Sequence, residues 1–159
     1  MKNKFLESLI RGIDAAGNVG DIKFRYALAK NRKKLIEEIS SMNEMLKPST
    51  EFNEYDRERM DLAAKMANKD KNGKPIVEND AYVFSDKSKF KKEFEKLKKE
   101  NKKVLDEREK QIKEFNDFLD MESTFEPHKI KQEDLPKNPD GSPMLSAVQI
   151  SEIIDLIEM

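Results

Sequence analysis

The sequence contains no cysteine and no tryptophan, and it has only one histidine and five glycines among its 159 residues. Without cysteine the chain can form no disulfides, no thiolate metal sites and no cysteine nucleophile. No apolar run approaches the roughly 18 residues of a membrane-spanning helix, and the N-terminus lacks the apolar segment of a signal peptide. These absences leave little material for familiar active sites, and we predict neither catalytic residues nor a cofactor.

Charge is abundant but balanced, because 31 Lys and Arg residues face 32 Asp and Glu residues, for a formal net charge of -1. Nucleic-acid-binding domains that depend on net charge are usually strongly basic. Charged residues make up 40% of the chain and hydrophobic residues 36%, so any core must be thin. The composition therefore predicts a soluble, elongated, helical interaction protein that forms a single domain over 1–159.

Apolar residues at helical spacing predict most of the elements in the first part of the chain. A first helix is expected over 5–13. Alternating apolar residues over 22–26 favour a short extended segment, which leads into a helix that ends before Pro48. A third helix is expected to begin at Ser49 or Thr50, since either side chain can accept hydrogen bonds from the first free N–H groups.

A fourth helix is the clearest predicted element, because no Gly or Pro interrupts 88–119 and its apolar side chains fall on one arc. The stripes over 28–46 and 90–119 are narrow, so we expect these two helices to pair antiparallel. Turn-forming residues at 70–75 lead to two short apolar runs, which predict a β-hairpin near 75–84. The expected fold is mainly α, an antiparallel long-helix hairpin or small bundle with a minor β-hairpin in a helical body over 1–120.

The last part of the chain is predicted to be an extended segment and turn over 121–142, followed by a short C-terminal helix over 143–159 with Pro143 at its first position. This helix carries more apolar residues than one stripe requires, and exposed apolar patches usually mark interfaces. The candidate partner-binding residues are Ile150, Ile153, Ile154 and Ile157. The alternative is that the helix simply closes one end of the bundle.

Nine lysines lie between residues 86 and 103 against four acidic residues, a local charge of +5. A helix face of this kind can follow phosphates, with candidate contacts at Lys91, Lys92, Lys98, Lys99 and Lys102. However, the lysines cover the whole polar back of the helix, and 104–122 carries seven acids against three bases, or -4. Alternating blocks are common on solvated coiled-coil helices, so nucleic-acid binding is the alternative and not the first hypothesis.

Two smaller motifs favour ordinary structural roles. Residues 68–73 carry oxygen-bearing side chains at alternate positions and Gly73 at the sixth, as in a calcium loop. The twelfth position of such a loop supplies a bidentate Glu, but here it is Asn79, so we predict a plain turn and no metal site. His128 has no second histidine or cysteine to work with, and a surface position is expected for it.

Polar residues interrupt the apolar stripes at Asn31, Arg32, Asn101 and Arg108. Polar groups buried in a helix seam cost stability unless they are paired, and they then favour one register or partner. A position at a solvent-exposed edge is the simpler interpretation, because an arginine stem can carry its charge into water.

Several stretches of the chain have counterparts in a known family. They are Gly17-Asn18, Lys23 to Leu35, Lys71 to Pro75, Tyr82 to Phe84, Phe125 to Leu135 and Ile153 to Glu158. From about Gly17 to Met159 the chain resembles a family of small uncharacterised helical proteins encoded by tailed phages and prophages of Gram-positive bacteria. The lysine-rich start of the fourth helix and the 49–59 segment are longer than this family leads one to expect.

The resemblance implies a viral origin and a non-enzymatic role, with no catalytic residues to transfer. It implies a protein–protein interaction module that acts in virion assembly or binds a host factor such as a defence protein. The expected partner is thus a phage structural protein or a host factor, with a homo-oligomer as a further option and no membrane. The expected location is the host cytoplasm or the virion.

Overall fold

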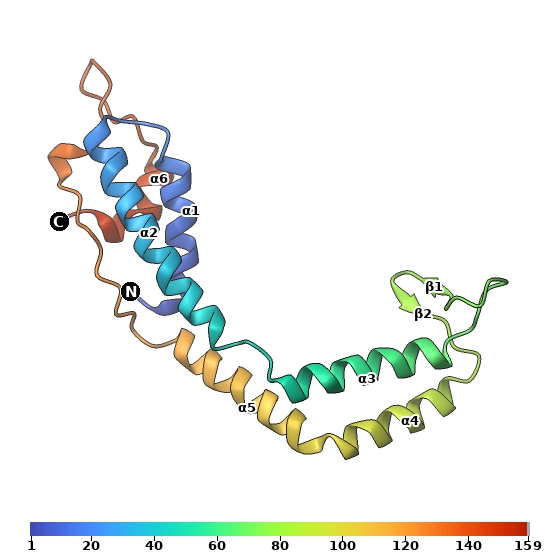
Figure 1. Cartoon of the computed structure of the whole chain (residues 1–159). Helices are drawn as coiled ribbons and strands as arrows, with labels where there is room; N and C mark the ends of the chain where they lie inside the picture. The colour runs from blue at the N-terminus through green and yellow to red at the C-terminus, as the bar shows by residue number, and fades with distance from the viewer. Residues whose placement is uncertain (159) are drawn as a thin grey trace. The chain divides into compact units, whose positions relative to one another are not determined.

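Two compact units make up the chain in a computed structural model, which describes residues 1–158. The first unit combines Met1–Leu46 with Glu114–Met159, and the second covers Lys47–Lys113. The described part contains six α-helices and a two-stranded antiparallel sheet (Figure 1), which confirms the mainly α fold with a minor β-hairpin and a short C-terminal helix. That the chain behaves as a single domain stays a prediction. Within 1–158, no helix combines the length and the apolar character needed to cross a membrane.

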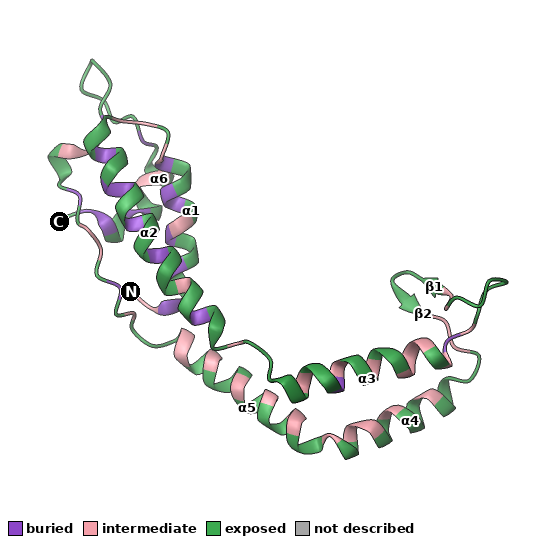
Figure 2. Cartoon of the chain, viewed as in Figure 1, coloured by how far each residue is buried: buried purple, intermediate pink, exposed green. Residues whose placement is uncertain are grey.

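The first unit is built on α1 (Leu6–Ala16), which packs against both α2 (Ile22–Glu44) and α6 (Ala147–Glu152). Leu6, Leu9, Ile13 and Ala16 of α1 are buried and belong to the hydrophobic core of this unit, and Figure 2 shows the buried stretches of α1 and α2 in purple. Gly12 allows the close approach of α1 to α6, because a Cβ placed there would lie 2.7 Å from the Cβ of Glu152 and 2.9 Å from its carbonyl oxygen.

The start of α2 differs from the sequence prediction of an extended segment over 22–26. The carboxylate of Asp21 accepts a hydrogen bond of 2.9 Å from the backbone N–H of Phe24, which caps the helix at its first residue. Because the helix begins at Ile22, the apolar residues that alternate in sequence lie on opposite faces. Phe24 is buried in the core, whereas Ile22 and Tyr26 are exposed.

The C-terminal part of the chain lies along the first unit and completes its core. Ile130 forms a parallel bridge with Ile157, and its N–H donates to the carbonyl of Leu156 over 2.8 Å. Between 121 and 142 the only helical element is the short 3-10 turn Gln132–Asp134. Phe125, Ile130 and Leu145 are buried against α1 and α2 side chains in one cluster.

The terminal helix begins at Ala147, four residues later than the predicted Pro143, because Ser146 and Gln149 form a capping box. The Ser146 hydroxyl accepts from the N–H of Gln149 over 3.2 Å, and the Gln149 side-chain oxygen accepts from the N–H of Ser146 over 3.0 Å. Capping of this kind satisfies two N–H groups that a helix start otherwise leaves free. After α6 the chain continues as the 3-10 turn Ile154–Leu156.

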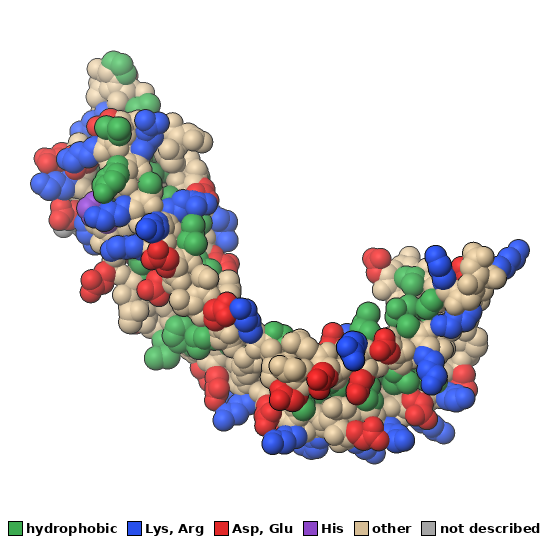
Figure 3. Space-filling view, viewed as in Figure 1, with side chains coloured by type: hydrophobic (Ala, Val, Ile, Leu, Met, Phe, Trp, Pro, Cys, Tyr) green, Lys and Arg blue, Asp and Glu red, His purple; other side chains and the backbone are tan. Residues whose placement is uncertain are grey.

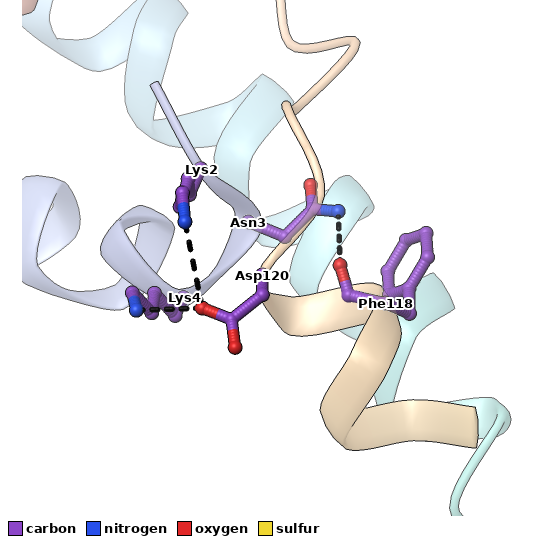
Figure 4. Close-up of polar contacts among 5 residues, drawn as sticks. All are labelled: Lys2, Asn3, Lys4, Phe118 and Asp120. Atoms are coloured by element: carbon purple, nitrogen blue, oxygen red, sulfur yellow. Dashed lines mark hydrogen bonds and ion pairs between the residues drawn. The ribbon is translucent and has the colours of Figure 1, made fainter. Parts of the chain in front are cut away.

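The N-terminal segment contacts the end of α5 (Lys102–Leu119) through polar side chains (Figure 4). The buried Asn3 donates from its side-chain nitrogen over 2.9 Å to the carbonyl of Phe118, which also accepts from the backbone N–H of Met121 over 3.1 Å at this helix end. Lys4 and Lys2 lie 2.6 Å and 3.7 Å from a carboxylate oxygen of Asp120. The hydrogen bond from Lys4, followed by the charges of Lys4 and Lys2, lowers the pKa of Asp120.

The second unit is a helical hairpin in which α3 (Thr50–Met66) packs against α4 (Lys87–Glu100). Ser49, one of the two caps predicted, begins α3 by accepting from the N–H of Phe52 over 3.1 Å. Between the helices, β1 (Val77–Glu78) pairs with β2 (Ala81–Tyr82). The two turn residues, Asn79 and Asp80, have φ values of 48° and 60°, which is the left-handed geometry that suits a two-residue hairpin.

The pairing of the predicted apolar stripes is corrected by this arrangement. A helical hairpin does form, but α4 lies on α3, and the helix over 22–44 packs on α1. Only the last turns of α5, which belong to the first unit, bring Phe115, Phe118 and Leu119 against the core that contains Leu35. The reason is that a narrow stripe specifies the width of a contact and not its partner, and helices adjacent in sequence usually pack together.

The predicted uninterrupted helix over 88–119 is divided at Asn101, between α4 and α5. The carbonyl of Leu97 accepts hydrogen bonds from both the backbone N–H and the side-chain nitrogen of Asn101, each over 3.1 Å. Asn101 has φ -102° and ψ 19°, outside the helical region. A side chain that competes for a helix carbonyl is a recognised cause of a kink.

Asn31 is the polar residue for which an exposed edge position is wrong. Its side chain is 0% exposed in the core of the first unit. The Nδ2 atom donates to the carbonyls of His128 over 2.8 Å and Ala27 over 3.1 Å, while Oδ1 accepts from the N–H of His128 over 2.7 Å. Asn31 therefore fixes the segment around His128 onto α2. Arg32 is exposed and pairs with Asp14 over 2.7 Å, as an edge position predicts.

Candidate functional site

Two of the four isoleucines predicted to bind a partner belong to the core of the first unit. Ile153 is 0% and Ile157 4% exposed, because the final 3-10 turn and the bridge to Ile130 direct them inward. Ile150 is half-buried against the same core, and Ile154 is exposed. The structure leaves no surface on Ile153 or Ile157 for a partner, which is the arrangement expected if this helix closes the bundle.

The predicted phosphate-contacting lysines lie on α4 and at the start of α5, where acidic residues one turn away neutralise two of the five. Lys98 lies 3.1 Å from a carboxylate oxygen of Glu95 and 4.6 Å from the centre of the Phe94 ring. Lys102 forms an ion pair with Asp106. Lys91, Lys92 and Lys99 are exposed. The face is therefore one of mixed charge, and only part of it is available to an anion.

The aromatic residues beside these lysines have a structural role in the second unit. The rings of Phe84 and Phe90 stack at 4.2 Å between centres, and Phe90 stacks on Phe94 at 5.8 Å. Tyr82 extends the row at 6.5 Å from Phe84. Because all four rings are half-buried, they hold the β-hairpin against α4 and do not form a free stacking platform.

The calcium-like segment over 68–73 is a turn, as predicted. The Asp70 side chain accepts hydrogen bonds from the N–H groups of Asn72 over 2.8 Å and Lys74 over 2.9 Å, and Gly73 has φ 74°. Asp70 thus stabilises its own loop. In the described range 1–158, no three His, Cys, Asp or Glu side chains group in a way that could hold a metal ion.

The surface that stands out is the outer face of α2, opposite the side that enters the core. Ile22 is 80%, Tyr26 64% and Ile36 44% exposed. With Ala29 and Lys33 they recur at intervals of four and three residues, which places them in one column along the helix. We call Ile22, Tyr26, Ala29, Lys33 and Ile36 the α2 column. Figure 3 shows hydrophobic side chains among blue Lys and Arg side chains where α2 lies.

Basic side chains border the α2 column. Six Lys and Arg residues and no Asp or Glu lie between Ile22 and Lys34. Three of the six are held by neighbouring elements: Lys23 by Asp134 over 2.6 Å, Arg32 by Asp14, and Lys34 by the carbonyl of Glu126 over 3.0 Å. The other three, Arg25, Lys30 and Lys33, are exposed.

Two ion pairs, Arg32 with Asp14 and Lys23 with Asp134, hold charged side chains in place beside the column. The hydrogen bond from Arg32 lowers the pKa of Asp14, and the hydrogen bond to Asp134 raises the pKa of Lys23. Asp14 and Lys23 therefore stay ionised at neutral pH, and Arg32 is held by Asp14 beside the α2 column. Arg25, Lys30 and Lys33 add positive charge on both sides and in the middle of it.

A shallow depression lies within the column, lined by Ala29, Arg32, Lys33, Ile36 and Glu37. Ala29 contributes only a methyl group where its neighbours are long. Such a hole between larger side chains is the shape that receives one apolar side chain of a second helix.

The sequence contained the signal for the α2 column, but the extended segment predicted over 22–26 concealed it. Once α2 begins at Ile22, the same helix shows two apolar faces, one with Phe24, Leu28 and Leu35 in the core and one exposed. The complete lack of acidic residues over 22–34 was a second available signal.

Comparisons of this chain with models of protein families, with curated proteins and with solved structures give no match.

Proposed function

We propose that this protein is a non-enzymatic protein–protein interaction module that contacts its partner through the α2 column. The observation that carries the proposal is the exposure of Ile22, Tyr26 and Ile36 on a helix whose opposite face is fully packed. Nothing in the folding of the first unit requires these three side chains to be apolar. Exposed apolar patches bordered by polar residues are typical of interaction sites.

The energy available from this surface is sufficient for a specific contact. Full burial of a large apolar side chain contributes about 1.5–3 kcal/mol, and these three are roughly half to four-fifths exposed, so each adds about 1–2 kcal/mol when covered. A few such side chains commonly dominate an interface. The partner within this proposal is a phage structural protein during virion assembly or a host factor such as a defence protein.

A second candidate function is nucleic-acid binding through the lysines of α4. The observation in its favour is that Lys91, Lys92 and Lys99 are exposed, and no ion pair is found for them within the described residues. The salt dependence of the binding affinity distinguishes the two functions. Phosphate contacts make affinity fall steeply as salt rises, whereas a contact anchored by apolar side chains changes little.

The test is affinity capture from host cells, infected and uninfected, with three forms of the full chain. They are the wild type, the column variant Ile22→Ser/Tyr26→Ser/Ile36→Ser, and a matched control Val148→Ser/Ile154→Ser that removes exposed apolar side chains elsewhere on the first unit. We expect a partner that is retained at high salt by the wild type and the control and is lost from the column variant.

Two results would contradict this proposal. If the column variant retains every partner and the control loses one, the surface lies at the terminal helix and not on α2. If the wild type binds duplex DNA with a steep salt dependence that Lys91→Gln/Lys92→Gln/Lys99→Gln removes, nucleic-acid binding is the better assignment.

A further inference from the structure

The α2 column has the geometry of a helix-pairing seam. Its members are separated by four, three, four and three residues, from Ile22 to Ile36, which is the repeat that keeps side chains facing one partner helix. The column is one side chain wide and about four turns long. Ala29 leaves the depression in its middle, with Tyr26 and Ile36 one to two turns to either side.

The charges around this seam identify the chemistry of the partner helix. Arg25 borders the column on one side and Lys30 borders it on the other, while Lys33 lies within it. Arg32, on the same side as Arg25, is neutralised by its ion pair with Asp14. No acidic side chain lies on α2 before Glu37. A helix laid along this column therefore meets the positive charge of Arg25 on one flank, of Lys30 on the other and of Lys33 between them, so acidic flanking residues are attracted and basic ones repelled.

We infer that the α2 column binds an acidic amphipathic helix of the partner protein, an inference that rests on the proposed function. The partner helix would present apolar side chains at the same four-and-three spacing. One of them enters the depression beside Ala29. Acidic side chains flank the apolar ones, and one faces Lys33.

A second copy of this chain is a poor occupant of the same surface. In an antiparallel pair of α2 helices, Tyr26 would face Ile36 of the other copy, and Ala29 would face its Lys33. This register brings Lys30 and Lys33 of both copies together around the two-fold axis. A parallel pair places every cation beside its own counterpart. Repulsion between like charges in such positions costs free energy, so the pairing of two α2 columns is disfavoured.

A nucleic acid and a lipid surface also fit less well than a helix. Phosphates would engage the cations but would leave Ile22 and Ile36 uncovered. A membrane would cover the apolar side chains only by drawing Lys33, in the middle of the column, into the apolar layer. An acidic helix satisfies the apolar and the charged members of the column together.

The experiment is a selection from a displayed library of helical peptides of about 20 residues, which form about five turns and so cover the roughly four turns of the column with about one turn to spare. The apolar positions are fixed as Leu or Ile, and the flanking positions are randomised over Glu, Lys, Gln and Ser. The immobilised target is the full chain at about 0.1 M salt, where charges within about 10 Å still interact. Selected peptides are then measured individually by fluorescence anisotropy.

We expect Glu to be enriched over Lys at the flanking positions. A selected peptide should bind the reversal variant Arg25→Glu/Lys30→Glu/Lys33→Glu at least about tenfold more weakly, and a Lys-flanked counterpart should bind this variant more tightly than the wild type. All three substitutions are at exposed positions. If the reversal variant does not fold by circular dichroism, the neutral variant Arg25→Gln/Lys30→Gln/Lys33→Gln replaces it, with a smaller loss in the same direction.

The outcomes separate this inference from the proposed function. Peptides that need Tyr26 and Ile36 but show no preference between Glu and Lys overturn the acidic partner and leave the interaction surface in place. If no selected peptide depends on Tyr26 and Ile36, the surface itself is refuted. Binding to duplex DNA or to phosphatidylglycerol vesicles that is lost in Tyr26→Ser/Ile36→Ser assigns the column to that ligand and overturns the inference.

Discussion

Asn31 offers the sharpest test of how the first unit is held together. Its side chain makes three hydrogen bonds, of 2.7, 2.8 and 3.1 Å, and two of them serve the backbone N–H and carbonyl of His128. The variant Asn31→Leu keeps a side chain of similar size but removes all three. The carbonyl of Ala27 lies inside α2 and keeps its helical hydrogen bond, so the N–H and carbonyl of His128 are the two groups left without a partner.

The expected loss follows from those two groups. A buried backbone group without a partner costs about 1–3 kcal/mol, which gives about 2–6 kcal/mol for two. His128 is half-buried, so water reaches part of the site, and we expect the lower half of that range, about 2–4 kcal/mol. The matched control is Asn43→Ala, which removes the same residue type from an exposed position of the same helix. It should change stability by less than about 0.5 kcal/mol.

The assay is urea denaturation combined with hydrogen exchange and mass spectrometry, so that the amides of α1 and α2 report on the first unit alone. The variant Asn31→Asp adds a pH dependence. Burial raises the pKa of a carboxyl group, so the folded form holds its proton to higher pH than the unfolded form. The penalty of this variant is therefore smallest below about pH 4 and grows as the pH rises. If Asn31→Leu is as stable as the wild type, Asn31 does not hold the His128 segment.

Four further predictions concern other elements. Gly12→Ala should lower the midpoint of unfolding despite a gain of about 1 kcal/mol in helix propensity, because the new methyl group overlaps Glu152 at a cost of about 1–3 kcal/mol; a stabilised variant would show that α1 and α6 can separate freely. Asn101→Ala should raise the helical signal in circular dichroism and add about 0.5 kcal/mol of stability, since it removes the competing side chain at the kink; no change would mean that the kink has another cause. The carboxylate of Asp120 has a lowered pKa, so its stabilising effect is fully present above about pH 4 and is lost as the pH falls through the folded pKa. Asp120→Asn should accordingly melt below the wild type at pH 6 and close to it at pH 2, and an equal gap at both pH values would contradict this. Amides of α3 and α4 should exchange faster than those of α1 and α2, because Tyr55 and Ala67 are the only buried hydrophobic residues described in the second unit; equal protection in the two units would instead support a single cooperative domain.

Local signals in the sequence determined most of the elements. The start of α3 was predicted to within one residue, at Ser49 or Thr50, because a cap acts within its own turn of helix and needs nothing from the rest of the chain. The β-hairpin near 75–84 followed from two short runs around turn-forming residues, and its turn closes over two residues. The turn at Asp70 was likewise predictable, since its hydrogen bonds span at most four residues.

The pairing of helices was decided only by the tertiary structure. The stripes over 28–46 and 90–119 were correctly identified as apolar, but apolar attraction has no direction, so a stripe accepts any partner of matching width. Which helix covers a given stripe depends on the loops that connect the helices and on close helix–helix approaches such as that of Gly12 to Glu152. The same uncertainty applied to the terminal helix, where the sequence left both a core and an interface role open for Ile153 and Ile157.

The role of individual polar and apolar side chains also depended on the fold. Asn31 and Arg32 are adjacent and both interrupt the same stripe, yet one is buried and the other exposed. The difference arises because the extended segment at His128, almost a hundred residues away, brings a free N–H and carbonyl to Asn31 alone. Ile22 and Tyr26 are exposed for a comparable reason, since α1 and the segment around His128 both pack against the opposite face of α2. A sequence records which side chains are apolar, but only the packed chain determines which of them remain uncovered.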